Sequence, residues 1–148
     1  MVYIYISMTS LYERLGGIHA IAGVVNDFSE AMIVDPMIGR ESPNPQLRDW
    51  HTNNLHRVPG AKVMRTLWVA DVTGGPYKYV STKPGRCDTC VEEVHRSLRI
   101  TENEYQRFTD IISTVLDLHG VKNPEKTEVM DAMAKHKKEV LEGSTDHN

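Results

Sequence analysis

The sequence predicts an all-α fold built as one domain. Apolar residues recur at helical spacing in four segments, and helix start and stop signals flank each of them. Alternation typical of a strand is confined to the short stretches "VYIYI" and "YKYV". The 148 residues are 40% hydrophobic and 25% charged, which is usual for a single globular domain.

The first two helices are predicted between residues 10 and 36. Ser10 and Glu13 have the spacing of a capping box, so a short helix starts here and ends at the glycine pair of residues 16–17. A longer helix follows and ends at the Asp-Pro pair of residues 35–36. Its apolar stripe consists of Ile18, Ile21, Ala22, Val25, Phe28, Met32 and Ile33.

Helical signals are weak between residues 37 and 60, a polar segment that contains three prolines. We expect only a short helix there, over residues 46–50. Pro59 suits the first turn of the next helix, which ends at "TGGP". The apolar stripe of that helix consists of Val63, Met64, Leu67 and Trp68.

Three helices are predicted in the second half of the chain. After the loop "YKYVSTKPGRCDTC", a short helix passes through His95. Thr101 and Glu104 form a second capping box, and the long helix that they open ends at Gly120. The Asn-Pro pair of residues 123–124 suits the cap and first position of the last helix. The inward faces of these two helices carry Tyr105, Phe108, Ile111, Ile112, Val115 and Leu116, and then Val129, Met130, Met133, His136 and Val140.

Composition and charge exclude several classes of protein. The net charge is -3 and no block is dense in lysine or arginine, so a nucleic-acid partner is not expected. No apolar run is long enough to span a bilayer. The start of the chain lacks the features of a signal peptide, so we expect a cytoplasmic protein. We expect residues 1–9 to be a disordered or arm-like leader, residues 10–142 the folded domain and residues 143–148 a flexible tail.

The stretch "CVEEVHRSLRITENEY" places His95 among apolar residues. It follows Val94, and Leu98 and Ile100 come three and five residues later. A histidine in such a setting is most often an ordinary core residue. If it binds a metal, haem suits it better than a bare ion. Zinc or iron alone needs three or four protein ligands, whereas haem needs one imidazole and an apolar slot.

The alternative is a small helical zinc or redox module without haem. Cys87, Cys90 and His95 would supply its ligands, with Glu92 or His56 completing a zinc site. A Cys-x-x-Cys followed by one nearby histidine is a weak zinc signal, because a second metal-binding pair is missing. A structural disulfide between the two cysteines is not expected in the cytoplasm.

Four motifs together resemble the truncated haemoglobins, closest to the first group of that family. They are "SLYERLGGIHAIAGVVNDF", "GGPYKY", "EVHRSLRIT" and "GVKNPEKTEVMDAMAKHKKEVL", and they occur in the family's order. The resemblance implies a two-over-two helical sandwich around haem b (iron protoporphyrin IX), with His95 as the proximal iron ligand. Residues 10–142 would then form a haem-binding globin domain.

The sequence departs from this family on the other, distal face of the haem. The family usually has Phe-Tyr in its second helix, where this chain has Phe28 and Ser29. Serine is too short to donate to a ligand as the phenol does. The family's phenylalanine after the Asp-Pro turn is also missing, and the segment between Pro36 and Gly74 looks longer than usual.

The helix before Gly74 is expected to supply the distal side instead. Trp68 N–H or the Arg65 guanidinium would donate to bound oxygen, and Met64 would be a second iron ligand. Met64 and Trp68 on a helical stripe are, however, most often core residues. The residues expected around the haem are His95, Met64, Arg65, Trp68, Tyr79, Val94, Leu98, Ile100 and Tyr105.

Other polar residues have weaker claims on the cofactor. His51 and His56 lie in the polar, proline-flanked segment, so we expect them to face solvent, although either would be able to fold over as a sixth ligand. Lys62 and Arg96 are candidates to pair with the haem propionates, but solvated charges are the default.

The resemblance implies a protein that binds a diatomic gas, oxygen or nitric oxide, as in oxygen transport. Nitric oxide dioxygenation or a peroxidase-like reaction would be further haem chemistry, and a reductase would be its partner. A third interpretation is a haem-free globin relative that acts as a binding scaffold, because the distal Tyr and Phe are missing.

Overall fold

All regular structure is helical in the computed structural model, which describes residues 9–77 and 95–145. This confirms the predicted all-α class. The α-helices are α1 (Leu11–Arg14), α2 (Gly17–Val34), α3 (Pro45–Asn53), α4 (Val58–Val72), α6 (Glu102–Leu118), α7 (Asn123–Ala134) and α8 (Lys137–Thr145), with one 3-10 turn, η1 (Leu55–Arg57). None of the helices in the described ranges has the length and apolar character needed to cross a membrane.

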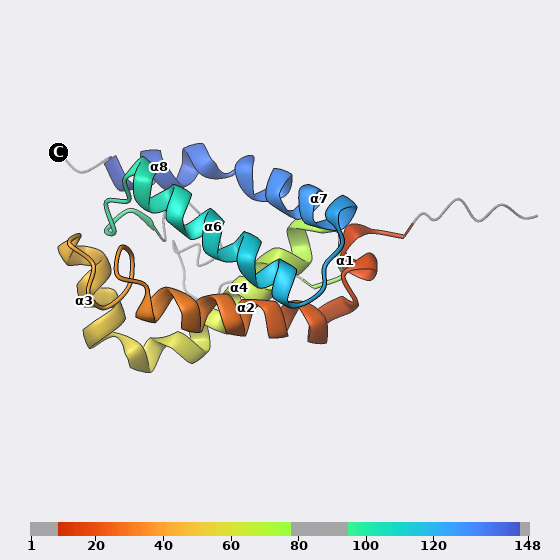
Figure 1. Cartoon of the computed structure of the whole chain (residues 1–148), viewed down its shortest axis with the longest axis horizontal. Helices are drawn as coiled ribbons and strands as arrows, with labels where there is room; N and C mark the ends of the chain where they lie inside the picture. Colours follow the sequence, from red (N-terminus) through yellow and green to blue (C-terminus); the bar gives the residue numbers. More distant parts are fainter. Residues whose placement is uncertain (1–8, 78–94, 146–148) are drawn as a thin grey trace, which may run out of the picture.

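Two helix pairs, α2 with α4 and α6 with α7, lie one over the other. Helix α2 makes its most extensive contacts with α4 and its next most extensive with α6, and α6 in turn contacts α7 and α8. Figure 1 shows α6 crossing over α2, with α7 and α8 along the upper side and α3 at the end of the molecule far from α1. This arrangement is the predicted two-over-two sandwich.

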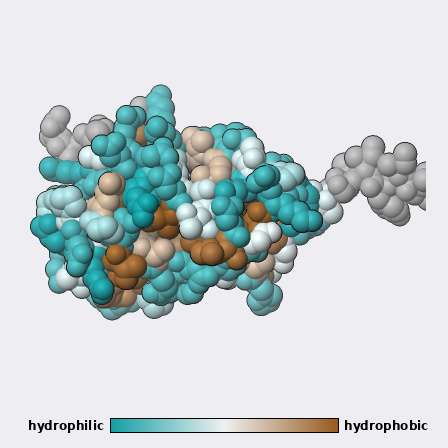
Figure 2. Space-filling model, viewed as in Figure 1, coloured by the Kyte–Doolittle hydropathy of each residue, from teal (hydrophilic) through white to brown (hydrophobic). Residues whose placement is uncertain are grey.

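The core lies between these pairs. Its buried residues come mainly from α2 and α6, whose predicted apolar stripes face it. The cluster contains Ile21, Val25, Phe28, Met32, Ile38, Leu47, Ile111, Ile112, Val115, Leu116 and Val129. On the face shown in Figure 2, hydrophobic residues gather in patches along the middle of the molecule and hydrophilic residues surround them.

The predicted helix boundaries are largely confirmed by the caps. Ser10 Oγ accepts from the Glu13 N–H at 3.2 Å, and Thr101 and Glu104 form both bonds of their capping box. Gly16 has a φ of 101°, a left-handed conformation that favours glycine and lets α2 start directly after α1. The predicted cap at Asn123 is wrong by one residue. Lys122 is the N-cap and provides no side-chain bond, so Pro124 alone marks this start.

The last predicted helix is interrupted between α7 and α8. The His136 N–H donates to Met133 O at 3.0 Å, the three-residue spacing of a 3-10 turn. The Tyr105 hydroxyl donates to the same Met133 carbonyl at 3.3 Å. The His136 ring packs edge-on against Trp68, with centroids 5.0 Å apart. The chain changes direction at this break, so that His136 packs against Trp68 and Val140 is also buried.

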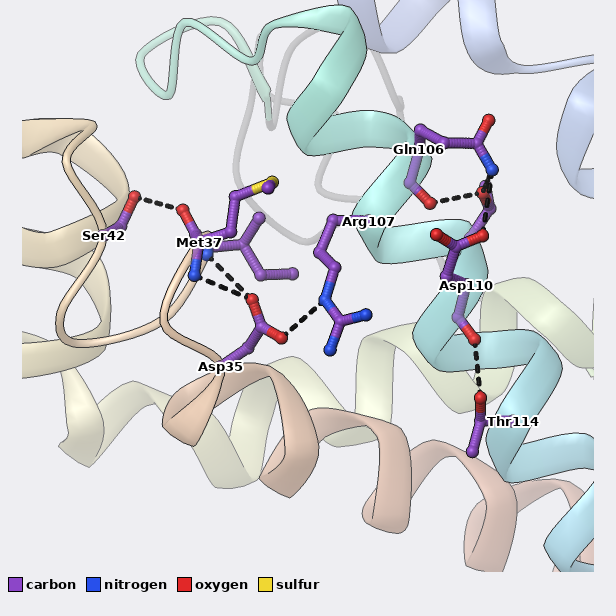
Figure 3. Close-up of polar contacts among 9 residues, drawn as sticks. Asp35, Met37, Ser42, Gln106, Arg107, Asp110 and Thr114 are labelled. Atoms are coloured by element: carbon purple, nitrogen blue, oxygen red, sulfur yellow. Dashed lines mark hydrogen bonds and ion pairs between the residues drawn. The ribbon is translucent and has the colours of Figure 1, made fainter.

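The end of α2 is fixed by one buried carboxylate (Figure 3). Asp35 Oδ1 accepts from the N–H groups of Met37 at 2.9 Å and Ile38 at 3.2 Å, and Oδ2 accepts from Arg107 Nε at 2.7 Å. Ser42 Oγ donates to Met37 O at 2.6 Å. The Asp-Pro turn predicted at residues 35–36 therefore also ties α2 to α6.

We predict that Asp35→Ala destabilises the fold. The change leaves buried N–H groups and the Arg107 guanidinium without their acceptor, at a cost of about 2–3 kcal/mol in the free energy of unfolding. Urea denaturation followed by circular dichroism measures this. The control is Gln106→Ala, because the Gln106 amide contacts only Thr109 and Asp110 of its own helix (Figure 3). Equal losses in the two variants would contradict the role given to Asp35.

Candidate functional site

A cavity of about 740 Å³ lies among α2, α3, α4, α6 and α7. This volume is within the range of small-molecule sites, and the lining is mostly apolar with a few polar side chains. Because protein interiors are otherwise close-packed, a space of this size among core residues indicates a ligand site. The polar or ionisable side chains on its wall are His51, His56, Arg57, Arg65, Ser97, Glu104 and His136, together with His95, Trp50, Trp68 and Tyr105.

One wall contains four of the predicted site residues. His95, Leu98, Ile100 and Tyr105 all line the cavity. His95 is half-buried, and its carbonyl accepts from the Leu98 N–H at 3.0 Å, so the chain turns directly after the imidazole. Leu98 and Ile100 pack against the core cluster. The structure therefore brings this imidazole and its apolar neighbours together at one wall, as the spacing predicts.

The segment after His95 is held in place by Asn44, which sequence reasoning missed. The Asn44 amide donates to Leu98 O at 3.0 Å, to Arg99 O at 3.3 Å and to Glu104 Oε1 at 3.0 Å. The Asn44 carbonyl oxygen caps α3 by accepting from the Gln46 N–H at 3.0 Å. One side chain thus joins the start of α3 to the segment that carries His95.

The predicted residues of α4 face the cavity from another side. Met64, Arg65 and Trp68 all line it. Arg65 NH1 donates to Ser29 Oγ at 2.9 Å. Its guanidinium lies 5.9 Å from the ring centroid of Phe28 and 5.7 Å from that of Trp50. Burial lowers the pKa of Arg65 to about 10, so the group stays positively charged at neutral pH.

His51 is placed differently from its prediction. It was expected to face solvent, yet it is 5% exposed on α3 and lines the cavity. Its Nδ1–H donates to Leu47 O at 2.9 Å. The spacing i, i+3, i+4, which is typical of a buried helix face, is present in Leu47, Trp50 and His51. The polar residues around them made this pattern hard to recognise in the sequence. His56 is exposed, as expected, at the cavity wall.

Some further expectations are corrected or lie outside the described residues. Lys62 does not point to the cavity as a partner for propionates. It pairs with Glu30 and donates to Asn26 Oδ1 at 2.9 Å. The described ranges contain no cluster of three or more His, Cys, Asp or Glu side chains able to hold a metal ion. Five candidate residues named in the sequence analysis lie outside the described ranges, namely Tyr79, Cys87, Cys90, Glu92 and Val94.

We predict that Asn44→Asp weakens the fold although it keeps the shape of the side chain. The aspartate still caps α3, but it cannot donate to Leu98 O and it places a second carboxylate beside Glu104. The free energy of unfolding should fall by about 1–3 kcal/mol in urea denaturation. Asn53→Asp is the matched control, because its amide contacts only Asp49 within α3. A loss no larger than that of the control would argue against the clamp.

The burial of His51 makes the free energy of unfolding depend on pH. Burial lowers the pKa of His51 below its ordinary value of 6.5. The unfolded chain therefore binds this proton near pH 6.5, whereas the folded chain binds it only at lower pH. The contribution of neutral His51 is complete above pH 6.5 and is lost as the pH falls from there towards the folded pKa.

We expect the free energy of unfolding to decline less steeply below about pH 6.5 in His51→Gln than in the wild type. Urea denaturation at a series of pH values gives both slopes. The control is His56→Gln, which removes an exposed histidine and should keep the wild-type slope. Identical slopes for the wild type and His51→Gln would show that His51 titrates alike in both states.

Comparisons with known proteins agree with this architecture. The model of the family described as "Bacterial-like globin" matches residues 10–142. A group 1 truncated hemoglobin, GlbN, from Mycolicibacterium paratuberculosis (strain ATCC BAA-968 / K-10) is 25% identical over 135 residues, covering 90% of this chain and 85% of that protein.

Solved structures show the same fold at low identity. The 2/2 hemoglobin of Synechococcus sp. PCC 7002, in the cyanomet state with covalently attached heme, has a TM-score of 0.70 and 21% identity, covering 90% of this chain and 98% of that one. The Fe(III) form of Tetrahymena pyriformis truncated hemoglobin has a TM-score of 0.69 and 18% identity over the same shares. The chain therefore belongs to the bacterial-like globin family, as a truncated globin that resembles group 1 at low identity.

Proposed function

We propose that this protein holds haem b in the cavity, with His95 as the axial ligand, and binds a small gas there. Membership of the globin family implies a haem cofactor and a small gaseous ligand. The names of the relatives, which are hemoglobins, support the same conclusion. The observation that carries the proposal is the position of His95, in its Val-His-x-x-x-x-Ile-Thr motif, on the wall of an apolar cavity of about 740 Å³.

The cavity fits a haem in both size and chemistry. A porphyrin needs an apolar slot and one imidazole, and the wall provides aliphatic and aromatic side chains from α2, α3, α4, α6, α7 and α8 beside His95. Among the other cavity histidines, His51 Nδ1 is held by Leu47 O, and His136 Nδ1 lies 2.9 Å from Glu139 Oε1. His56 is exposed. A histidine that binds iron through Nε2 commonly makes such an Nδ1 contact, so these contacts do not decide among the cavity histidines. The Val-His-x-x-x-x-Ile-Thr motif, which resembles that of the truncated haemoglobins, favours His95 as the ligand.

The residues around the cavity have separable tasks. Phe28, Leu98 and Ile112 exclude water from its interior. Arg65 and Trp68 bring N–H donors to the α4 side, where they would hold a polar gas ligand in place. Haem, when bound, supplies an iron centre for the gas and its redox chemistry. Nitric oxide dioxygenation and a reductase partner remain predictions from the sequence.

Haem retention in His95 variants tests the proposal. We expect the wild type to purify with a Soret band, or to gain one with hemin, and His95→Ala to lose most of its haem because the iron loses its protein ligand. His95→Gly should regain a wild-type-like spectrum when free imidazole is added. His56→Ala, the exposed cavity histidine, should keep its haem. Failure of the wild type to take up hemin, or a His95→Ala spectrum unchanged from wild type, would overturn the proposal.

A further inference from the structure

Arg65 is a partly buried cation without an acidic partner in the described part of the chain. Its guanidinium has five N–H donors, and the contact found for it among the described side chains is the hydrogen bond to Ser29 Oγ at 2.9 Å. The rings of Phe28 and Trp50 lie near it and offer no carboxylate. The side chain also lines the cavity, so unused donors face a space that a ligand can enter.

Several other basic residues in the described ranges are paired with acids. Arg14 contacts Glu125 and Glu128, Arg107 contacts Asp35, and Lys126 contacts Asp117. Buried charges in proteins are usually paired, because a lone charge in an apolar setting is costly. Arg65 departs from this rule, and it lines the cavity, where a small anion would be able to reach it.

We propose that Arg65 forms a binding site for a small planar oxyanion of the size and shape of formate. The planar guanidinium presents parallel N–H groups that match two oxygens of such an anion. Phe28 and Trp50 lie near the guanidinium, so an anion that binds there lies beside two aromatic rings. The site goes beyond gas binding, because a neutral diatomic gas does not neutralise a buried positive charge. It rests on Arg65 and its neighbours, whether or not haem occupies the rest of the cavity.

Formate and formamide provide a matched pair of probes. They are alike in size and shape, and they differ in the negative charge. Isothermal titration calorimetry on the protein as purified should show formate binding and much weaker formamide binding. In Arg65→Met, which keeps an unbranched side chain, the Kd for formate should rise at least about tenfold. Arg40→Met is the control, because Arg40 is an exposed arginine outside the cavity.

A melting experiment separates this proposal from a purely structural role for Arg65. Because Arg65→Met removes an unpaired buried charge, its Tm without formate should equal or exceed that of the wild type. Formate should raise the Tm of the wild type and leave that of the variant unchanged. A variant that melts well below the wild type, or that gains as much from formate, would overturn the proposal.

Haem content, read from the Soret band of the same samples, distinguishes the two proposals. Formate binding that depends on Arg65, in a protein that gains no Soret band even when hemin is added, would support the anion site and count against the haem function. Samples with full haem in which formate binds equally to wild type and Arg65→Met, or to neither, would refute the anion site and leave the haem function standing.

Discussion

The helices of this protein pack around a shared cavity, and their packing has to leave that cavity open. Phe28, Ile112 and Val129 belong to the packed core cluster and also line the cavity, so the same side chains serve both. Apolar faces normally pack until no space remains. Here directional contacts fix the distances between helices instead. The Asp35 carboxylate joins α2 to α6, and the Trp68 ring meets His136 beyond the end of α7.

Several departures of the sequence from the family pattern meet on one side of the cavity. Ser29 stands where the resemblance expects a tyrosine, and its small side chain leaves room for the Arg65 guanidinium, which donates to its hydroxyl. The segment after α2 contains α3, whose Trp50 ring lies beside the same guanidinium. Residues that look unrelated in the sequence therefore lie together in the structure.

Burial lowers the pKa of both Arg65 and His51, but the two groups differ in their charge at neutral pH. The guanidinium has so high an intrinsic basicity that Arg65, with a pKa of about 10, stays charged at neutral pH. The imidazole titrates near neutrality, so the same desolvation keeps His51 neutral over a wider pH range. The wall thus combines one fixed positive charge with one neutral ring, and both are surrounded by apolar side chains.

The sequence by itself determined the helices and one wall of the site. Caps and apolar stripes act within four residues, so Thr101 with Glu104, and His95 with Leu98 and Ile100, are readable locally. Tertiary structure alone decided the burial of His51, the break before α8 and the Asn44 clamp. Asn44 meets Leu98 across 54 positions of the chain, and such a contact depends on the path of the segments between them. The spacing of residues within one helix does not indicate that path, because the contact forms only when distant helices pack against each other.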